Sequence, residues 1–188
     1  MITVVNNLNE IPFNLFGVTD LVMIDLDNTL VNVRPKMSLK EDNSPDLLKN
    51  ICAPVFGFTA RRTGFPSKLS KISNQEWTAS MLKELELQFT CISDAPLFVD
   101  NQYKDCKVHQ QQKPYFISEG PMIYKGVIYC DNIDKGHILL AFLAHYNEEI
   151  SNIIIIDDCM QNLLNIQTAL NSIKNTTLQL KLYHYFNK

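Results

Sequence analysis

Two short runs of consecutive apolar residues stand out along the chain, and acidic residues follow each of them at once. The runs are "LVMI" at 21–24 and "IIII" at 153–156. A continuous apolar run of this length is typical of a strand buried on both faces of a parallel sheet. Further strands are predicted over residues 1–5, 54–59 and 178–186, and residues 122–130 are predicted to form a hairpin that turns at Lys125–Gly126.

Segments with helical spacing of apolar residues alternate with these strands. A stripe with an apolar residue at every fourth position begins at Trp77 and predicts a buried helix face. Ser73 followed by Glu76 fits a capping box at the start of the same helix. Strands alternating with helices predict an α/β domain with a mainly parallel sheet. The predicted helices cover residues 73–89, 134–146 and 159–173, with a brief helix within 6–16.

Composition narrows the class of protein. A length of 188 residues suits a single domain. The net charge of -3 argues against a nucleic-acid-binding protein, which is usually basic. Five dispersed cysteines without a CxxC pair argue against a metal–thiolate site and predict reduced thiols. The N-terminus lacks the pattern of a signal peptide and no apolar run suits a membrane span, so a cytoplasmic protein is expected.

Polar residues with chemical potential lie where the predicted strands end. Asp25 and Asp27 follow the first apolar run, Thr59 ends the strand at 54–59, and Asp157 and Asp158 follow the second run. Ligands of parallel sheets bind beyond the carboxyl ends of the strands, so these residues are expected to converge. Four carboxylates in one small volume need either protons or a cation between them. Oxygen ligands without His or Cys favour Mg²⁺, which commonly also binds a substrate phosphate.

Lys135 is predicted to open a helix, where the helix dipole disfavours a cation. A bound phosphate facing the Lys135 ammonium would offset that cost, and Gly136 would let the backbone approach a ligand. Arg61 and Arg62 are predicted to lie on a solvated surface rather than to face a phosphate.

These residues together resemble the haloacid dehalogenase (HAD) superfamily of phosphotransferases. The four sequence motifs of that superfamily occur here in the same order, between about residue 20 and residue 165. Within it, "FTARR", "YKGVIYC" and "IDDCMQNL" are similar to a bacterial branch of largely uncharacterised proteins. The matching residues are Asp25, Asp27 and Thr29 in "DLDNT", Thr59 in "GFTAR", Lys135, and Asp157 and Asp158 in "IIIIDDCMQN".

The resemblance implies a Rossmann-like core and an Mg²⁺-dependent phosphomonoester hydrolase. Asp25 would attack phosphorus and form an aspartyl-phosphate. Asp27 would protonate the leaving oxygen and later take a proton from water, as in the phosphatase and mutase branches. Thr59 and Lys135 would bind the phosphate.

The implied metal ligands are Asp25, Asp27 through its backbone carbonyl, Asp158 directly, and Asp157 directly or through water. Many relatives place a further Asp four or five residues after the acidic pair, where this chain offers Asn162.

The long gap between Thr59 and Lys135 predicts a small lid at residues 93–128 that sets substrate specificity. The substrate is expected to be phosphorylated, and a small lid would leave an open site. Two alternatives stay open at this point: a phosphotransferase or mutase on the same fold, and a non-enzymatic binding protein on an HAD-like scaffold.

Overall fold

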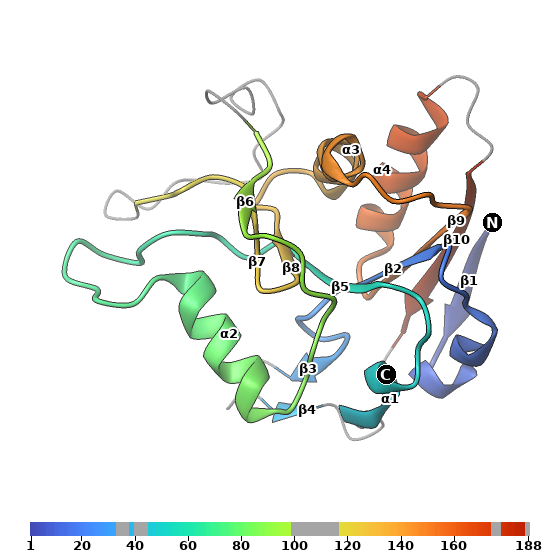
Figure 1. Ribbon diagram of the computed structural model, residues 1–188, viewed down its shortest axis with the longest axis horizontal. Helices are drawn as coiled ribbons and strands as arrows, with labels where there is room; N and C mark the ends of the chain where they lie inside the picture. The colour runs from blue at the N-terminus through green and yellow to red at the C-terminus, as the bar shows by residue number, and fades with distance from the viewer. Residues whose placement is uncertain (33–37, 40–44, 99–116, 174–177, 187–188) are drawn as a thin grey trace.

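One eight-stranded sheet organises the chain. The computed structural model describes residues 1–32, 38–39, 45–98, 117–173 and 178–186 (Figure 1). The strand order is β1-β10-β9-β2-β5-β8-β7-β6, and a separate two-stranded sheet pairs β3 with β4. The strands are β1 (Ile2–Val5), β2 (Asp20–Ile24), β3 (Val31–Asn32), β4 (Ser38–Leu39), β5 (Val55–Thr59), β6 (Ala95–Pro96), β7 (Met122–Tyr124), β8 (Val127–Tyr129), β9 (Asn152–Asp157) and β10 (Gln179–Tyr185).

Most of the large sheet is parallel. The pairs β1·β10, β10·β9, β9·β2, β2·β5 and β5·β8 all run in parallel, and only β7 and β6 at one edge are antiparallel. Every residue of β2 and β5 is buried, as are all but the first of β9. The prediction of a mainly parallel sheet with strands buried on both faces is therefore confirmed.

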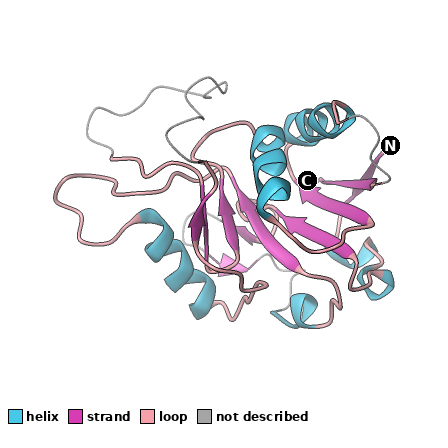
Figure 2. Cartoon of the chain, turned by 45° about the horizontal axis from the view of Figure 1, so that its top comes forward, coloured by secondary structure: helices cyan, strands magenta, loops and turns pink. Residues whose placement is uncertain are grey.

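Helices cover both faces of the sheet (Figures 1 and 2). On one face of the sheet, Met23 and nearby strand residues pack against α3 and α4. On the other face, Ile24 and nearby strand residues pack against α1 and α2. Alternate residues of a strand point to opposite faces, so one apolar run serves both cores. The helices are α1 (Pro45–Lys49), α2 (Asn74–Glu84), α3 (Lys135–His145) and α4 (Met160–Asn171), and two 3-10 turns, η1 (Leu8–Glu10) and η2 (Phe13–Leu15), form where a brief helix was predicted.

The predicted helix cap and the predicted hairpin turn are both present in the structure. The side chain of Ser73 caps α2 and forms the predicted capping box with Glu76. Lys125 and Gly126 both adopt positive φ, of 48° and 75°, at the predicted hairpin turn between β7 and β8.

The apolar stripe predicted for α2 is wrong at its first position. Trp77 is 50% exposed, and the buried residues of the helix are instead Gln75, Thr78 and Leu82. Thr78 accepts a hydrogen bond from a neighbouring arginine, described below, so a polar contact sets which side of the first turn faces inward.

The hairpin within the predicted lid segment, residues 93–128, belongs to the core sheet. β8 pairs with β5 in parallel, and β7 and β6 extend the same sheet to its edge. These strands therefore do not form a separate lid. Residues 99–116, the polar centre of that segment, lie outside the described residues, so a lid there stays a prediction.

The topology places a switch point between β2 and β9. After β2 the chain continues to β5 on one side, whereas after β9 it passes through α4 to β10 on the other side. Ligands of open α/β sheets bind at such a switch point, beyond the carboxyl ends of the two strands. Asp25 follows β2 directly and Asp157 ends β9, so both lie at this switch point.

Candidate functional site

Asp25 is held at the end of β2 by neighbours on both sides. Its backbone N–H donates to the carbonyl of Ile156 on β9 at 2.8 Å, which extends the pairing of the two strands by one residue. The Thr29 hydroxyl donates to the Asp25 carboxylate at 3.2 Å. A tight turn follows, in which Asn28 adopts a φ of 65° and the N–H of Leu30 donates to the carbonyl of Leu26. The turn fixes the Asp25 carboxylate, which is 6% exposed, at the switch point between β2 and β9.

Lys135 is the centre of the site. It lies at the first turn of α3, is 2% exposed, and its Nζ donates to Asp25, to Asp157 and to the carbonyl of Phe58, each at 2.6 Å. An ammonium has three protons, so all of its donors are used. Asp134 caps α3 by accepting from the N–H groups of the second and third helical residues. The prediction that Lys135 opens a helix is confirmed. Its contacts with Asp25 and Asp157 were not predicted, and its role toward a phosphate stays a prediction.

Gly136 allows close packing of two helices. A Cβ at this position would lie 2.7 Å from the carbonyl oxygen of Asn165 and 2.9 Å from the Cβ of Ala169, both on α4. The missing side chain therefore lets α3 and α4 pack closely, whereas the approach of a ligand to the Gly136 backbone stays a prediction.

The two carboxylates at the end of β9 differ in burial: Asp157 is buried and Asp158 is half-buried. Asp157 is fully buried and accepts from Lys135, from the backbone N–H of Cys159 at 2.8 Å and from the Asn162 amide at 3.1 and 3.2 Å. Asn162 thus supports Asp157 through hydrogen bonds. Asp158 is the more accessible of the two carboxylates.

Three carboxylates meet in one small volume. One oxygen from each of Asp25, Asp157 and Asp158 lies within 4.8 Å of the others. Three carboxylates and one ammonium, that of Lys135, leave two uncompensated negative charges when all are ionised. One divalent cation balances that charge, and an all-oxygen donor set suits Mg²⁺. These residues therefore fit the cation that the sequence implies.

Burial and repulsion shift the titration of the cluster. Burial raises the pKa of Asp25 to about 8; the ammonium of Lys135 opposes the rise, and the charge of Asp157 adds to it. Burial also raises the pKa of Asp158, and Asp157 contributes in the same direction. For Lys135, burial disfavours the charge, but the carboxylates of Asp157 and Asp25 outweigh it and raise the pKa. Without a cation, a proton on Asp25 is the favoured way to relieve the repulsion.

Asp27 is paired with an arginine, which sequence reasoning missed. Arg61 Nε donates to both Asp27 carboxylate oxygens, at 3.1 and 2.9 Å, and Nη2 donates to one of them at 2.5 Å. The Arg61 side chain is only 13% exposed, and Arg62 is partly buried, so the predicted solvated surface is wrong. The side chain of Asp27 does not belong to the group of three carboxylates. A metal contact through its backbone carbonyl stays a prediction.

Thr59 lies at the end of β5, between the Arg61–Asp27 ion pair and the cluster around Lys135. It is fully buried, and its Oγ1 accepts from the backbone N–H of Arg61 at 3.2 Å. The preceding carbonyl, that of Phe58, binds Lys135. The fold thus brings together Asp25, Lys135, Asp157 and Asp158 directly, and places Thr59 and Asp27 beside them through Phe58 and Arg61.

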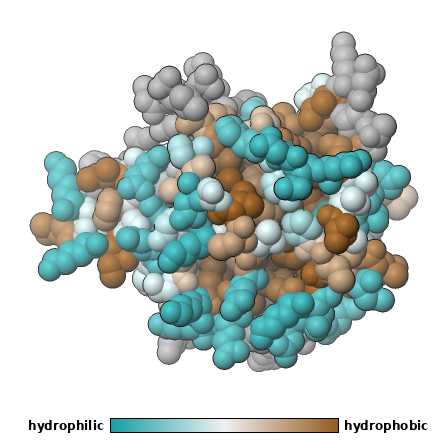
Figure 3. Space-filling model, in the orientation of Figure 1, coloured by the Kyte–Doolittle hydropathy of each residue, from teal (hydrophilic) through white to brown (hydrophobic). Residues whose placement is uncertain are grey.

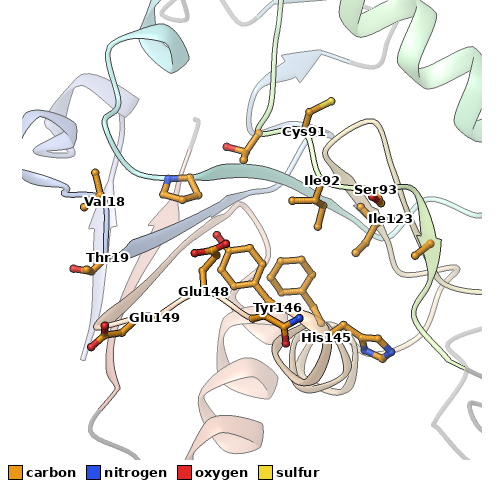
Figure 4. Close-up of a pocket in the computed structure, with 15 residues that line it drawn as sticks. Val18, Thr19, Cys91, Ile92, Ser93, Ile123, His145, Tyr146, Glu148 and Glu149 are labelled. Carbon is orange, nitrogen blue, oxygen red and sulfur yellow. The ribbon is translucent and has the colours of Figure 1, made fainter.

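A cavity of about 880 Å³ lies at the opposite end of the sheet (Figure 4). It is lined by Thr19, Pro54 and Glu149, which precede β2, β5 and β9, and by the rings of Phe142 and Tyr146. The amino ends of the parallel strands therefore border it, whereas the acidic cluster lies at their carboxyl ends.

Hydrophobic residues also gather near the middle of the face drawn in Figure 3, between bands of hydrophilic residues.

Comparison with known proteins identifies the family. Residues 26–188 match the family model described as "Protein of unknown function (DUF2608)". The chain belongs to this family. The match includes Asp27, Thr59, Lys135, Asp157 and Asp158, and it begins one residue after Asp25.

Similar proteins come from Rickettsia. An "Uncharacterized protein" of Rickettsia felis is 28% identical over 160 residues, and "Uncharacterized protein RC0398" of Rickettsia conorii is 26% identical over 161 residues. Each alignment covers 85% of this chain and 51% of the relative, so the chain spans about half the length of the curated relatives it matches. No solved structure matches the chain. None of the helices in the described residues is long and apolar enough to span a membrane.

Proposed function

We propose that this protein is an Mg²⁺-dependent phosphomonoester hydrolase of the HAD type that acts through an aspartyl-phosphate on Asp25. One observation carries the proposal. The buried ammonium of Lys135 holds Asp25 and Asp157 together, with Asp158 beside them, at the switch point of a parallel sheet. Ion pairs that only stabilise a fold rarely leave two negative charges uncompensated, because burying an unbalanced charge is costly.

The proposed first step transfers the phosphoryl group to Asp25. A carboxylate oxygen of Asp25 attacks phosphorus and the bond to the leaving oxygen breaks, while Asp27 supplies the proton that this oxygen needs. Thr59 donates to a phosphate oxygen, and Lys135 offsets negative charge on the same group. Arg61 holds the Asp27 carboxylate in place through its guanidinium.

The second step releases phosphate. A water molecule attacks phosphorus as Asp27 takes its proton, and the Asp25 carboxylate leaves. Mg²⁺, held by Asp158 and Asp25, would supply positive charge for the phosphate oxygens and for the nucleophile. Because the pKa of Asp25 is about 8 without a cation, a bound cation would also favour the ionised, nucleophilic form of this carboxylate.

The direct test is an assay of a panel of phosphomonoesters with Mg²⁺ and with chelator. We expect hydrolysis that requires Mg²⁺ and releases one phosphate per turnover. A protein that binds Mg²⁺ yet hydrolyses no member of a broad panel would contradict the proposal.

Mg²⁺ is expected to raise the melting temperature of chelator-treated protein. The ion binds the assembled carboxylates and hardly binds the unfolded chain, so at a hundred times its dissociation constant it stabilises by about 2.7 kcal/mol. For a chain of this size that corresponds to a rise of about 5–10 °C. Calorimetry at matched ionic strength with Na⁺ separates coordination from screening.

Two variants that each remove one negative charge sharpen this measurement. Asp158→Asn should abolish most of the Mg²⁺ effect, because Asp158 is the accessible carboxylate of the cluster. Asp46→Asn, at an exposed ion pair with Lys49, should leave it intact. Equal Mg²⁺ responses in the two variants would show that the effect is not due to the cluster.

Asp27→Asn is expected to impair substrates with poor leaving groups most. Alkyl phosphates need a proton on the leaving oxygen, whereas p-nitrophenolate leaves without one, so kcat should fall by about 10²–10⁴ for the former and much less for the latter. Arg61→Gln is the matched control, because it removes the ion pair but keeps the carboxylate. If both variants discriminate equally between the two substrates, Asp27 acts through the ion pair and not as an acid.

A further inference from the structure

We propose that Trp77 is a stacking platform for the leaving group, so that the substrates are phosphomonoesters whose leaving group carries a planar aromatic ring one sugar's length from the phosphate. The inference rests on the proposed function and names the substrate class of the same site. Nucleoside monophosphates have this chemistry.

The exposure of Trp77 is the first observation. Trp77 is 50% exposed near the start of α2, although the same helix buries Gln75, Thr78 and Leu82. A single exposed apolar residue is common and carries no function by itself. What distinguishes Trp77 is the residue on which its ring rests.

A fixed guanidinium joins Trp77 to the candidate site. The Cζ atom of Arg61 lies 5.6 Å from the centroid of the Trp77 ring. The same guanidinium donates to the Asp27 carboxylate and, through Nη1, to the Thr78 hydroxyl at 2.9 Å. Arg61 is thus held from both sides, and its planar group supports one part of the indole by a cation–π contact. The ring is thereby prepared for a ligand without a large loss of side-chain freedom on binding.

The phosphate-binding residues, Asp27, Arg61 and Trp77 follow one another in space, and this order gives the direction in which the leaving group would extend. Lys135, Thr59 and Asp25 surround the place of the phosphate, and Asp27 serves the leaving oxygen. One guanidinium then separates Asp27 from the indole. Because a guanidinium lies between Asp27 and the indole, we expect a ring bonded directly to the phosphate oxygen to fall short of Trp77 and a ring carried by a sugar to reach it. A purine or pyrimidine is planar and stacks on an indole in the offset geometry that aromatic rings prefer.

The cavity at the amino ends of the strands is not the place for this ring. Its lining residues, which include Tyr146 and Phe142, lie at the amino ends of the strands, whereas Asp27 lies beyond their carboxyl ends. A ligand bound there could not present a phosphate to Lys135.

The single tryptophan of the chain gives a direct readout. In Asp25→Asn protein with Mg²⁺, which binds without turnover, AMP is expected to quench the Trp77 fluorescence saturably. Ribose 5-phosphate, which has the same phosphate and sugar but no ring, should bind about 5–150-fold more weakly and quench little. Inorganic phosphate should displace AMP, which links the quenching to the phosphate site. Equal affinities for AMP and ribose 5-phosphate, or quenching that phosphate does not reverse, would overturn the proposal.

Phosphotyrosine tests the spacing. Its ring is joined directly to the phosphate oxygen, so it should bind more weakly than AMP. A preference for phosphotyrosine over AMP would overturn the assignment of a ring at sugar distance.

Variants of Trp77 test the ring itself, with calorimetry in place of fluorescence. In the Asp25→Asn background, Trp77→Leu should weaken AMP binding to the level of ribose 5-phosphate, and Trp77→Phe should retain part of the difference. Leu69→Ala, which truncates a 92% exposed apolar residue in the loop before α2, should change neither affinity. If Trp77→Leu weakens AMP and ribose 5-phosphate equally, Trp77 does not contact the ring.

The two proposals fail in different ways. Tight, ring-dependent binding of AMP without hydrolysis by the unaltered protein would support the platform and contradict the phosphatase. Hydrolysis of ribose 5-phosphate as efficient as that of AMP would support the phosphatase and contradict the platform.

Discussion

Asp25→Asn is expected to lower kcat for every good substrate by about three orders of magnitude or more, because the amide cannot attack phosphorus. The fold should not suffer. Asn has the shape of the protonated aspartic acid, which is the form that burial favours for a group with a pKa of about 8. Steady-state turnover of p-nitrophenyl phosphate and the melting temperature in chelator measure the two effects separately.

The matched control lies at the other end of the same strand. Asp20 begins β2, is 7% exposed, and accepts hydrogen bonds from the backbone N–H of Gly17 and from the amide of Asn152. Asp20→Asn should therefore reduce stability and leave kcat nearly unchanged. Near-normal turnover by Asp25→Asn would rule out the covalent mechanism, and a comparable loss of kcat in both variants would indicate damage to β2.

The residues on strand ends could be predicted because the signal is local. Four consecutive apolar residues before Asp25, and four before Asp157, mark strands buried on both faces, and a parallel sheet brings strand ends to one edge. That β2 and β9 are direct neighbours does not follow from those runs alone. Their pairing joins residues far apart in the sequence, and only the complete strand order fixes it.

The side chains that surround Asp27 could not be predicted for a related reason. Arg61 and Trp77 carry no periodic or motif signal of their role. Spacing places Trp77 on the apolar stripe of α2, but the Arg61–Thr78 hydrogen bond turns the other side of the first turns inward. One specific polar contact between a loop and a helix outweighs the apolar pattern here. An arginine two residues after the strand-end Thr59, near a strand-end carboxylate, was the available clue.

The segment between β6 and β8 also shows that local signals are predictable from sequence and pairing between distant residues is not. The turn residues Lys125 and Gly126 between two short apolar runs predicted the hairpin correctly. Its place in the main sheet depends on pairing with β5, where Gly57, Phe58 and Thr59 lie opposite Val127, Ile128 and Tyr129. Spacing between motifs shows that residues are inserted, but it does not show which of them join the core.

Lys135→Met is expected to destabilise the chelated protein by about 3–5 kcal/mol above about pH 8, because it removes the ammonium that pairs with Asp25 and Asp157 and leaves their charges buried. For a chain of this size the melting temperature should fall by about 6–20 °C. Met keeps most of the side-chain volume, so loss of charge and not of packing dominates. Lys49→Met, at the exposed ion pair with Asp46, is the matched control and should change the melting temperature little.

The loss in Lys135→Met is expected to depend on pH with a definite sign. Burial raises the pKa of Asp25 above its ordinary value, and the ammonium of Lys135 opposes that rise, so its removal raises the pKa further. A carboxyl group with a raised pKa in the folded state stabilises the fold below its unfolded pKa, and this contribution is lost as pH rises through the folded value. The deficit relative to the unaltered protein should therefore be small near pH 5 and largest above about pH 8. Mg²⁺ should restore part of the stability at high pH, because it replaces the missing positive charge. A deficit that is independent of both pH and Mg²⁺ would mean that Lys135 acts through packing, and that the three carboxylates do not form the charged site proposed for them.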